Sequence, residues 1–132
     1  MPHYSYEHTF QPGGTKDKQE ELEMPCPSGT LTNVLINFKP GCHGLVHVHI
    51  DVGLHQIFPT NPEEYYSFND YTVEIKDKYE LLPGTRKLYL RGYNEGVYPH
   101  KIHVAFEIEP KEVLSEAEEA VISIAELLAG ED

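Results

Sequence analysis

The sequence predicts an all-β protein, an antiparallel β-sandwich of jelly-roll or related Greek-key type, with one C-terminal amphipathic α-helix. Seven or eight short segments alternate apolar and polar residues, and turn residues separate them at spacings of roughly 8–12 residues. After residue 110 the apolar residues follow helical spacing instead. We therefore expect a β-sandwich domain over residues 1–110, followed by a helix and tail over residues 111–132.

The first expected strand covers residues 3–10, where Tyr4, Tyr6 and Phe10 share one face. The clearest alternation occurs in residues 45–52 and in residues 100–108. Other strands are expected over residues 20–24, 31–38, 53–59, 71–82 and 88–91. The apolar face of these strands predicts a core made of Val34, Ile36, Val46, Val48, Ile50, Leu88, Leu90, Ile102, Val104 and Phe106.

The C-terminal helix is predicted over residues 115–129. Ser115 and Glu118 fit a capping box, in which each side chain bonds a free backbone amide of the first turn. A helix of roughly 14 residues is marginal alone in water, because most helical stability comes from packing of an apolar face. The apolar stripe Val121, Ile124 and Leu128 therefore needs a surface, and we expect that surface to belong at least partly to another subunit or a partner protein.

The composition argues against several functions. The chain has 132 residues and a net charge of −12, which repels nucleic-acid phosphates. It has no apolar run near the roughly 18 residues of a membrane span, so no membrane partner is expected. Cys26 and Cys42 flank the strand expected over residues 31–38, too far apart for a disulfide within one subunit.

The histidines are the candidate metal ligands. His47, His49 and Asp51 share the polar face of the strand expected over residues 45–52, and the spacing from Gly41 to the two histidines resembles the opening of the first cupin motif. The cupin pattern then requires a glutamate where this chain has glycine and leucine, and its second motif has no counterpart. In the metal alternative the chain is a cupin-like enzyme whose candidate ligands are His47, His49, His55 and His103. In the other interpretation the polar face of this strand contacts water or another subunit.

No catalytic motif and no cofactor are expected. Cys42 and His43 are adjacent in sequence, so their side chains point apart on an extended chain, and nothing electropositive supports a thiolate. The aromatic residues Tyr65, Tyr66, Phe68 and Tyr71 fit a core that anchors the loop, a subunit interface with Tyr65, Tyr66 and Phe68, or a sugar-stacking platform. The interface is favoured because the chain has no tryptophan, and a carbohydrate-binding module is kept as an alternative.

Four segments together resemble small β-sandwich proteins from the virions of tailed viruses of bacteria and archaea. These segments are residues 38–50, 55–62, 92–94 and 98–100. The resemblance implies a non-enzymatic structural protein located in the virion, such as a capsid decoration, connector or tail-associated subunit. The expected partners are other protein subunits of the particle, with the chain as a homo-oligomer.

Overall fold

The computed structural model describes residues 3–110, which form eight β-strands and contain no α-helix. The strands are β1 (His3–Phe10), β2 (Glu20–Pro25), β3 (Gly29–Phe38), β4 (Val46–Val52), β5 (His55–Phe58), β6 (Tyr71–Glu80), β7 (Lys87–Asn94) and β8 (His100–Pro110). The all-β prediction is confirmed for this part of the chain. The helix predicted over residues 115–129 lies outside the described residues.

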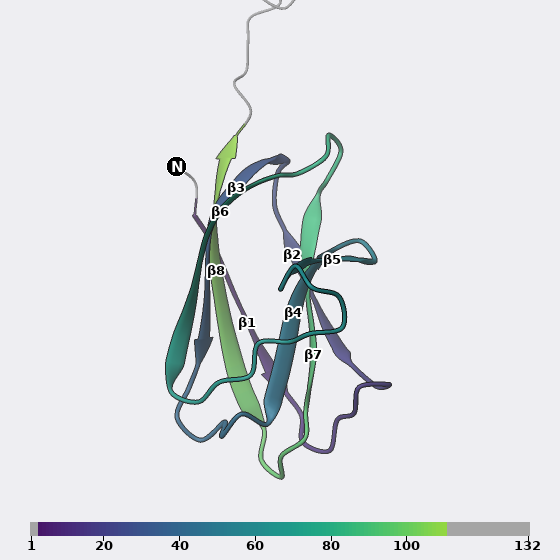
Figure 1. The fold of residues 1–132 in the computed structure, drawn as a ribbon, viewed down its shortest axis with the longest axis vertical. Helices are drawn as coiled ribbons and strands as arrows, with labels where there is room; N and C mark the ends of the chain where they lie inside the picture. The colour runs from purple at the N-terminus through teal and green to yellow at the C-terminus, as the bar shows by residue number, and fades with distance from the viewer. Residues whose placement is uncertain (1–2, 111–132) are drawn as a thin grey trace, which may run out of the picture.

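The strands form two antiparallel four-stranded sheets in a sandwich-like arrangement (Figure 1). The strand order is β1-β8-β3-β6 in one sheet and β2-β7-β4-β5 in the other. Strands that neighbour each other in a sheet are therefore mostly far apart in the sequence, and the chain passes repeatedly from one sheet to the other. No helix in the described part of the chain is long and apolar enough to cross a membrane.

One hydrophobic core joins the inner faces of the two sheets. All ten predicted core residues are buried, with exposed fractions of 2% or less, because the alternation along each strand places them on its inner face. The core also contains Phe10, Met24 and Phe38, which are fully buried. Aliphatic and aromatic side chains thus form the inner faces of both sheets.

A close approach of two backbones explains Gly92 in the middle of β7. Gly92 lies opposite Val48 of β4, and a Cβ atom there would lie only 2.1 Å from the carbonyl oxygen of His47. A side chain at position 92 would force the strands apart. This contact fixes the pairing of β4 with β7, which in turn aligns the polar residues on the outer face of the sheet.

The loops at one end of the sandwich are bonded to one another. The side-chain oxygen Oδ1 of Asn69 accepts hydrogen bonds from the backbone amides of Gly41 and His43, both at 2.9 Å. The Asp70 amide donates to the carbonyl oxygen of Lys39 at 3.4 Å. At the opposite end, the start of β1 lies beside the end of β8, because His3 pairs with Glu107.

Candidate functional site

The candidate site lies on the outer face of the β2-β7-β4-β5 sheet. Three polar residues of β4 project outwards, because Val46, Val48 and Ile50 occupy the inner face. The register with β7 places His47 opposite Tyr93, His49 opposite Arg91, and Asp51 opposite Tyr89. Side chains opposite each other on one sheet face are close enough to interact.

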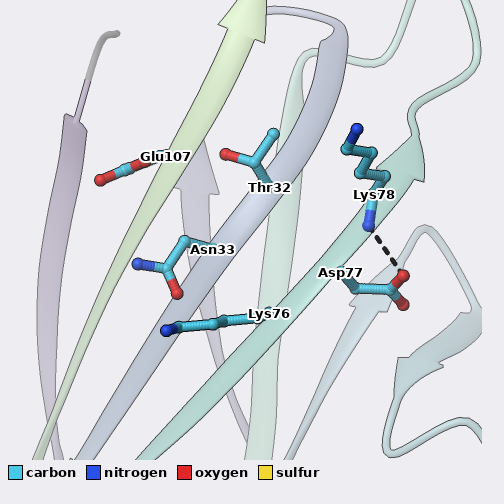
Figure 2. Close-up of a pocket in the computed structure, with 6 residues that line it drawn as sticks. All are labelled: Thr32, Asn33, Lys76, Asp77, Lys78 and Glu107. Atoms are coloured by element: carbon cyan, nitrogen blue, oxygen red, sulfur yellow. Dashed lines mark hydrogen bonds between the residues drawn. The ribbon is translucent and has the colours of Figure 1, made fainter.

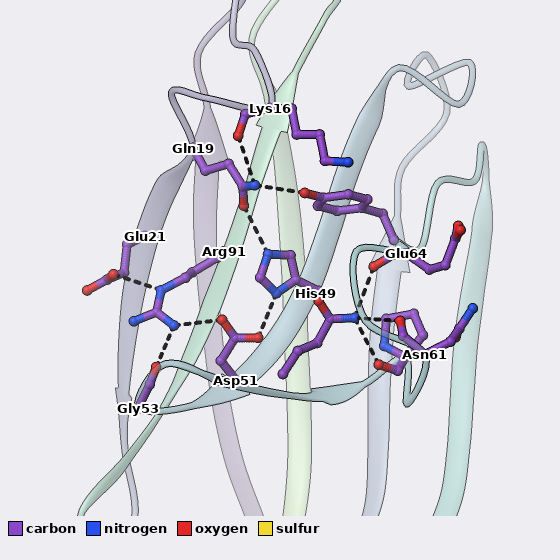
Figure 3. A network of polar contacts seen from close by, with 12 residues as sticks. Lys16, Gln19, Glu21, His49, Asp51, Gly53, Asn61, Glu64 and Arg91 are labelled. Carbon is purple, nitrogen blue, oxygen red and sulfur yellow. Dashed lines mark hydrogen bonds and ion pairs between the residues drawn. The ribbon is translucent and has the colours of Figure 1, made fainter.

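Asp51 lies at the centre of a buried polar network (Figure 3). Its Oδ1 atom lies 2.6 Å from Nδ1 of His49, and its Oδ2 accepts a hydrogen bond of 2.6 Å from Arg91. The Arg91 guanidinium also donates to Glu21 of β2 at 2.9 Å and to the carbonyl oxygen of Gly53. Three strands and the β4–β5 turn are therefore joined through one guanidinium and one carboxylate.

Two loops cover this network. Oε1 of Gln19 lies 2.9 Å from Nε2 of His49, while Nε2 of Gln19 donates to the Tyr65 hydroxyl at 2.8 Å and to the Lys16 carbonyl at 3.1 Å. A carbonyl oxygen only accepts, which fixes the orientation of the Gln19 amide. Both ring nitrogens of His49 thus lie within hydrogen-bond distance of side-chain oxygens, one of Asp51 and one of Gln19.

The prediction that the polar face of β4 meets water or a neighbouring subunit is wrong for two of its residues. His49 and Asp51 are only 7% and 3% exposed, because the loops carrying Gln19 and Tyr65 cover them. Both loops come from distant parts of the sequence. Periodicity within β4 reports which face a residue occupies but not what covers that face.

The charges of the network support one another. Burial acts to raise the pKa of Asp51, but the hydrogen bonds and positive charges of His49 and Arg91 outweigh it and lower that pKa below its ordinary value. Burial likewise acts to lower the pKa of Arg91, and its bonds to Asp51 and Glu21 raise it above the ordinary value. Asp51 and Arg91 are therefore both charged at neutral pH.

His47 has different surroundings. Its ring stacks on Tyr93 with centroids 4.7 Å apart, and its Nδ1 atom pairs with the hydroxyl of Ser67. An oxygen of Glu95 lies 3.4 Å from Nε2, but Nε2 makes no hydrogen bond. The Tyr65 ring makes T-shaped contacts with both His47 and His49, at centroid distances of 6.1 and 5.1 Å.

The four histidines of the metal alternative are not brought together. His47 and His49 lie on the outer face of β4, His55 is exposed at the start of β5, and His103 lies on β8 in the other sheet, paired with Ser5. Among residues 3–110 no group of three or more His, Cys, Asp or Glu side chains is placed to hold a metal ion. Their sequence spacing therefore does not correspond to a shared site.

The cysteines are buried thiols. Cys26 and Cys42 are both free, and they flank β3 as expected. Burial raises the pKa of Cys26 to about 11 and also raises that of Cys42, in each case against a smaller opposing effect of a backbone hydrogen bond. A raised pKa favours the neutral thiol over the nucleophilic thiolate.

The predicted interface residues fall into three groups. Tyr65 and Tyr66 are half-buried, and Tyr66 exchanges two backbone hydrogen bonds with Val48, at 3.0 and 2.9 Å. Phe68 is exposed and contacts Tyr71, with ring centroids 5.1 Å apart. The helix residues Val121, Ile124 and Leu128 lie outside the described residues.

Exposed apolar side chains gather at one end of the sandwich, where β3 leads into β4, β6 begins and β7 turns into β8. We call this set the apolar end: Leu45, Phe68, Tyr71, Val97 and Tyr98. Val97 and Tyr98 are the most exposed of them, at 78% and 70%. The loops that carry them are held by the two hydrogen bonds that the Asn69 side chain accepts from backbone amides, and by a 3.0 Å bond from the Glu95 amide to the Leu45 carbonyl.

A hollow of about 620 Å³ lies on the outer face of the other sheet (Figure 2). Its lining residues come from β3, β6 and β8: Thr32, Asn33, Lys76, Asp77, Lys78 and Glu107. The hollow is next to the register irregularity between Leu31 and Asn33. Two buried side-chain oxygens there, the Thr32 hydroxyl and the Asn33 amide oxygen Oδ1, have no hydrogen-bond partner. Charges of both signs surround it, so the hollow does not favour a ligand of either charge.

Sequence reasoning found His47, His49 and Asp51 but missed Gln19, Glu21 and Arg91 as their partners. The alternation of residues 88–91 already placed Arg91 on the polar face of its strand. Its contact with Asp51 depends on the pairing of β4 with β7, which the alternation does not determine.

In comparisons with known proteins, neither a protein-family model nor a curated protein matches the chain.

Proposed function

We propose that the chain is a non-enzymatic structural protein of a virus particle, acting through protein–protein contacts as a homo-oligomer or on a larger shell. The finer fold that we assign is a jelly roll. The orders β1-β8-β3-β6 and β2-β7-β4-β5 support it, because they are those of an eight-stranded, double-sheet jelly roll. Viral capsid proteins, lectins and cupins use this architecture, so the choice among them depends on particular residues.

Two observations favour the structural role over the alternatives. His47 and His49 project away from the sandwich interior, whose inner faces carry apolar side chains, and His49 is tied to Asp51 and Gln19. Tyr65 is half-buried and packs against the rings of His47, His49 and Tyr93, so its ring is poorly placed to stack on a sugar.

The apolar end is the observation that carries the proposal. Exposed apolar side chains that cluster on bonded loops are typical of protein-binding surfaces. The loops of the apolar end are already ordered by Asn69 and by the Leu45 carbonyl, so docking would cost little conformational entropy. The net charge of −12 favours solubility of the subunit before assembly.

The test is whether the chain is present in particles and attached through the apolar end. Particles from cells that produce the chain are purified on a density gradient and analysed by mass spectrometry. We expect the chain to be present, and the double substitution Val97→Ser with Tyr98→Ser to reduce the bound amount about tenfold.

Leu82→Ser is the matched control. Leu82 is also highly exposed, but it lies at the opposite end of the sandwich, between β6 and β7. It should leave the bound amount unchanged. A chain that never accompanies particles, or equal loss with both variants, contradicts the proposal.

A further inference from the structure

The free edge of β1 differs from the other three edges of the two sheets. The edge strands are β1 and β6 in one sheet and β2 and β5 in the other. An unprotected edge offers backbone amides and carbonyls to another strand, so proteins shorten it, interrupt it or place Lys or Pro on it. The four edges can be compared by these features.

Three edges carry protective features. β6 pairs with β3 through a register irregularity and carries exposed Lys76 and Lys78. β2 has six residues, ends at Pro25 and is strongly acidic, and β5 has only four residues and is followed by Pro59. A strand from another molecule is poorly accommodated on any of them.

β1 has none of these features. All eight of its residues, His3–Phe10, pair with β8 in one uninterrupted register, and the strand contains no Pro, Gly or Lys. Within residues 3–110 β1 pairs with no other strand. This edge is therefore regular, long and open to a further strand.

We propose that β1 pairs antiparallel with β1 of a second copy of this chain, about a two-fold axis at Ser5, which makes one continuous eight-stranded sheet across the dimer. Antiparallel addition at a sheet edge satisfies the free backbone groups of both strands. With Ser5 opposite Ser5, the small side chain is at the axis, and its neighbour across β8 is Ala105. On the outer face the Ser5 hydroxyl also bonds the His103 ring of its own chain.

Complementary polar side chains, imidazoles opposite carboxylates, support this register and this occupant. It places His3 opposite Glu7 of the second copy, and the two-fold axis makes the contact twice. Within each chain, His3 pairs with Glu107 and Glu7 pairs with His103. On the outer face of the dimer, one row of side chains therefore crosses the seam in the order Glu107, His3, Glu7 of the second copy and His103 of the second copy. Acidic and basic groups alternate along the row, whereas a register centred on Glu7 would oppose two carboxylates.

The inner side of the seam is also self-complementary. The same register places Tyr4 opposite Tyr6 of the second copy, again twice. Both rings are already stacked on Phe106, with centroids 5.5 and 6.0 Å away, so they are held in place before pairing. Aromatic pairs across neighbouring strands stabilise a sheet.

The first test is sedimentation velocity of the full chain. We expect a dimer, and Ser5→Lys should raise its dissociation constant about tenfold or more, because two like charges then meet at the axis. Thr72→Lys is the matched control: Thr72 is exposed on the opposite edge of the same sheet and also bonds a side chain of a neighbouring strand. It should leave the dimer unchanged.

Charge exchange tests the register. Glu7→Lys should weaken the dimer, and adding His3→Glu in the same chain should restore it, because the opposed charges are then reversed. Hydrogen exchange of the unmodified chain gives a readout that needs no variant: protection of amides in residues 3–9 should increase with protein concentration. A monomeric chain, equal effects of the two Lys variants, or no restoration by the charge exchange would each overturn the pairing.

The β1 pairing rests on the proposed function in one respect: the proposed structural role includes a homo-oligomer, and the β1 pairing is the contact that would form it. The two proposals nevertheless fail separately. A dimer that is absent from particles contradicts the structural role alone. A chain that is present in particles but is monomeric in solution contradicts the β1 pairing alone.

Discussion

Asp51 and Arg91 lie on neighbouring strands, and an oxygen of the Asp51 carboxylate accepts a 2.6 Å hydrogen bond from the Arg91 guanidinium. The Asp51 side chain is 4% exposed and that of Arg91 16%, so the pair is largely withdrawn from water. Both groups have further partners, His49 for the acid and Glu21 for the base. A satisfied buried pair adds little net stability, whereas removal of one partner leaves an unpaired charge.

Asp51→Asn should therefore destabilise the protein by about 2–3 kcal/mol. This is a small loss for a broken buried ion pair, because Glu21 still neutralises the charge of Arg91. Urea unfolding at pH 7 measures this free energy. Glu74→Gln is the control, since Glu74 forms an exposed ion pair with Lys76 and should change stability by less than about 0.5 kcal/mol. Equal effects of the two variants would show that the buried network is not the cause.

The stability contributed by Asp51 should depend on pH. Its pKa in the folded protein is lowered, so the carboxylate contributes fully above the unfolded pKa of about 4 and loses that contribution as the pH falls through the folded value. The difference in unfolding free energy between the unmodified chain and Asp51→Asn should therefore shrink between pH 7 and about pH 3. Urea titrations of both proteins at the two pH values measure it; a difference that grows in acid contradicts the assignment.

Gln56 should control the loop that carries Tyr65. Its side-chain amide donates to the carbonyl oxygens of Pro59, Asn61 and Glu64 at 2.9, 3.2 and 3.1 Å (Figure 3). Gln56→Glu replaces this donor by a carboxylate facing three carbonyl oxygens. We expect hydrogen exchange at the amides of Val48 and Tyr66, which donate to each other's carbonyl oxygens, to become about tenfold faster.

Gln11→Glu is the control for this variant, because Gln11 is exposed and only its backbone amide is bonded, to Glu20. It should leave the exchange of Val48 and Tyr66 unchanged. If Gln56→Glu also has no effect, the three carbonyl contacts do not hold the loop.

Truncation after Pro110 tests the role of the predicted helix. Residues 3–110 already form two sheets with a shared hydrophobic core, so we expect the truncated chain to keep its β-type circular dichroism and cooperative unfolding. Its association with particles should be weaker, because the apolar stripe ending at Leu128 is expected to contact another subunit. If the truncated chain fails to fold while the intact chain is a monomer, the stripe belongs to the chain's own core.

Strand alternation predicted the core well but the site only in part. Val46, Val48 and Ile50 are buried as expected, because a period of two residues reports directly on the face of a strand. The surroundings of His49 were not predictable in the same way. They depend on Gln19 and Tyr65, 30 and 16 residues away in the sequence, and on a strand pairing that local patterns do not determine.

The closeness of His3 to Glu107, in adjacent antiparallel strands, has a practical consequence for anyone who attaches cargo to this protein. A fluorescent protein or antigen joined ahead of β1 emerges beside the end of β8, at the end of the sandwich remote from Val97 and Tyr98 (Figure 1). Cargo joined there would leave the apolar end uncovered. If that end docks on a shell, the fused cargo faces outwards, and the chain becomes a carrier for displaying it on a particle surface.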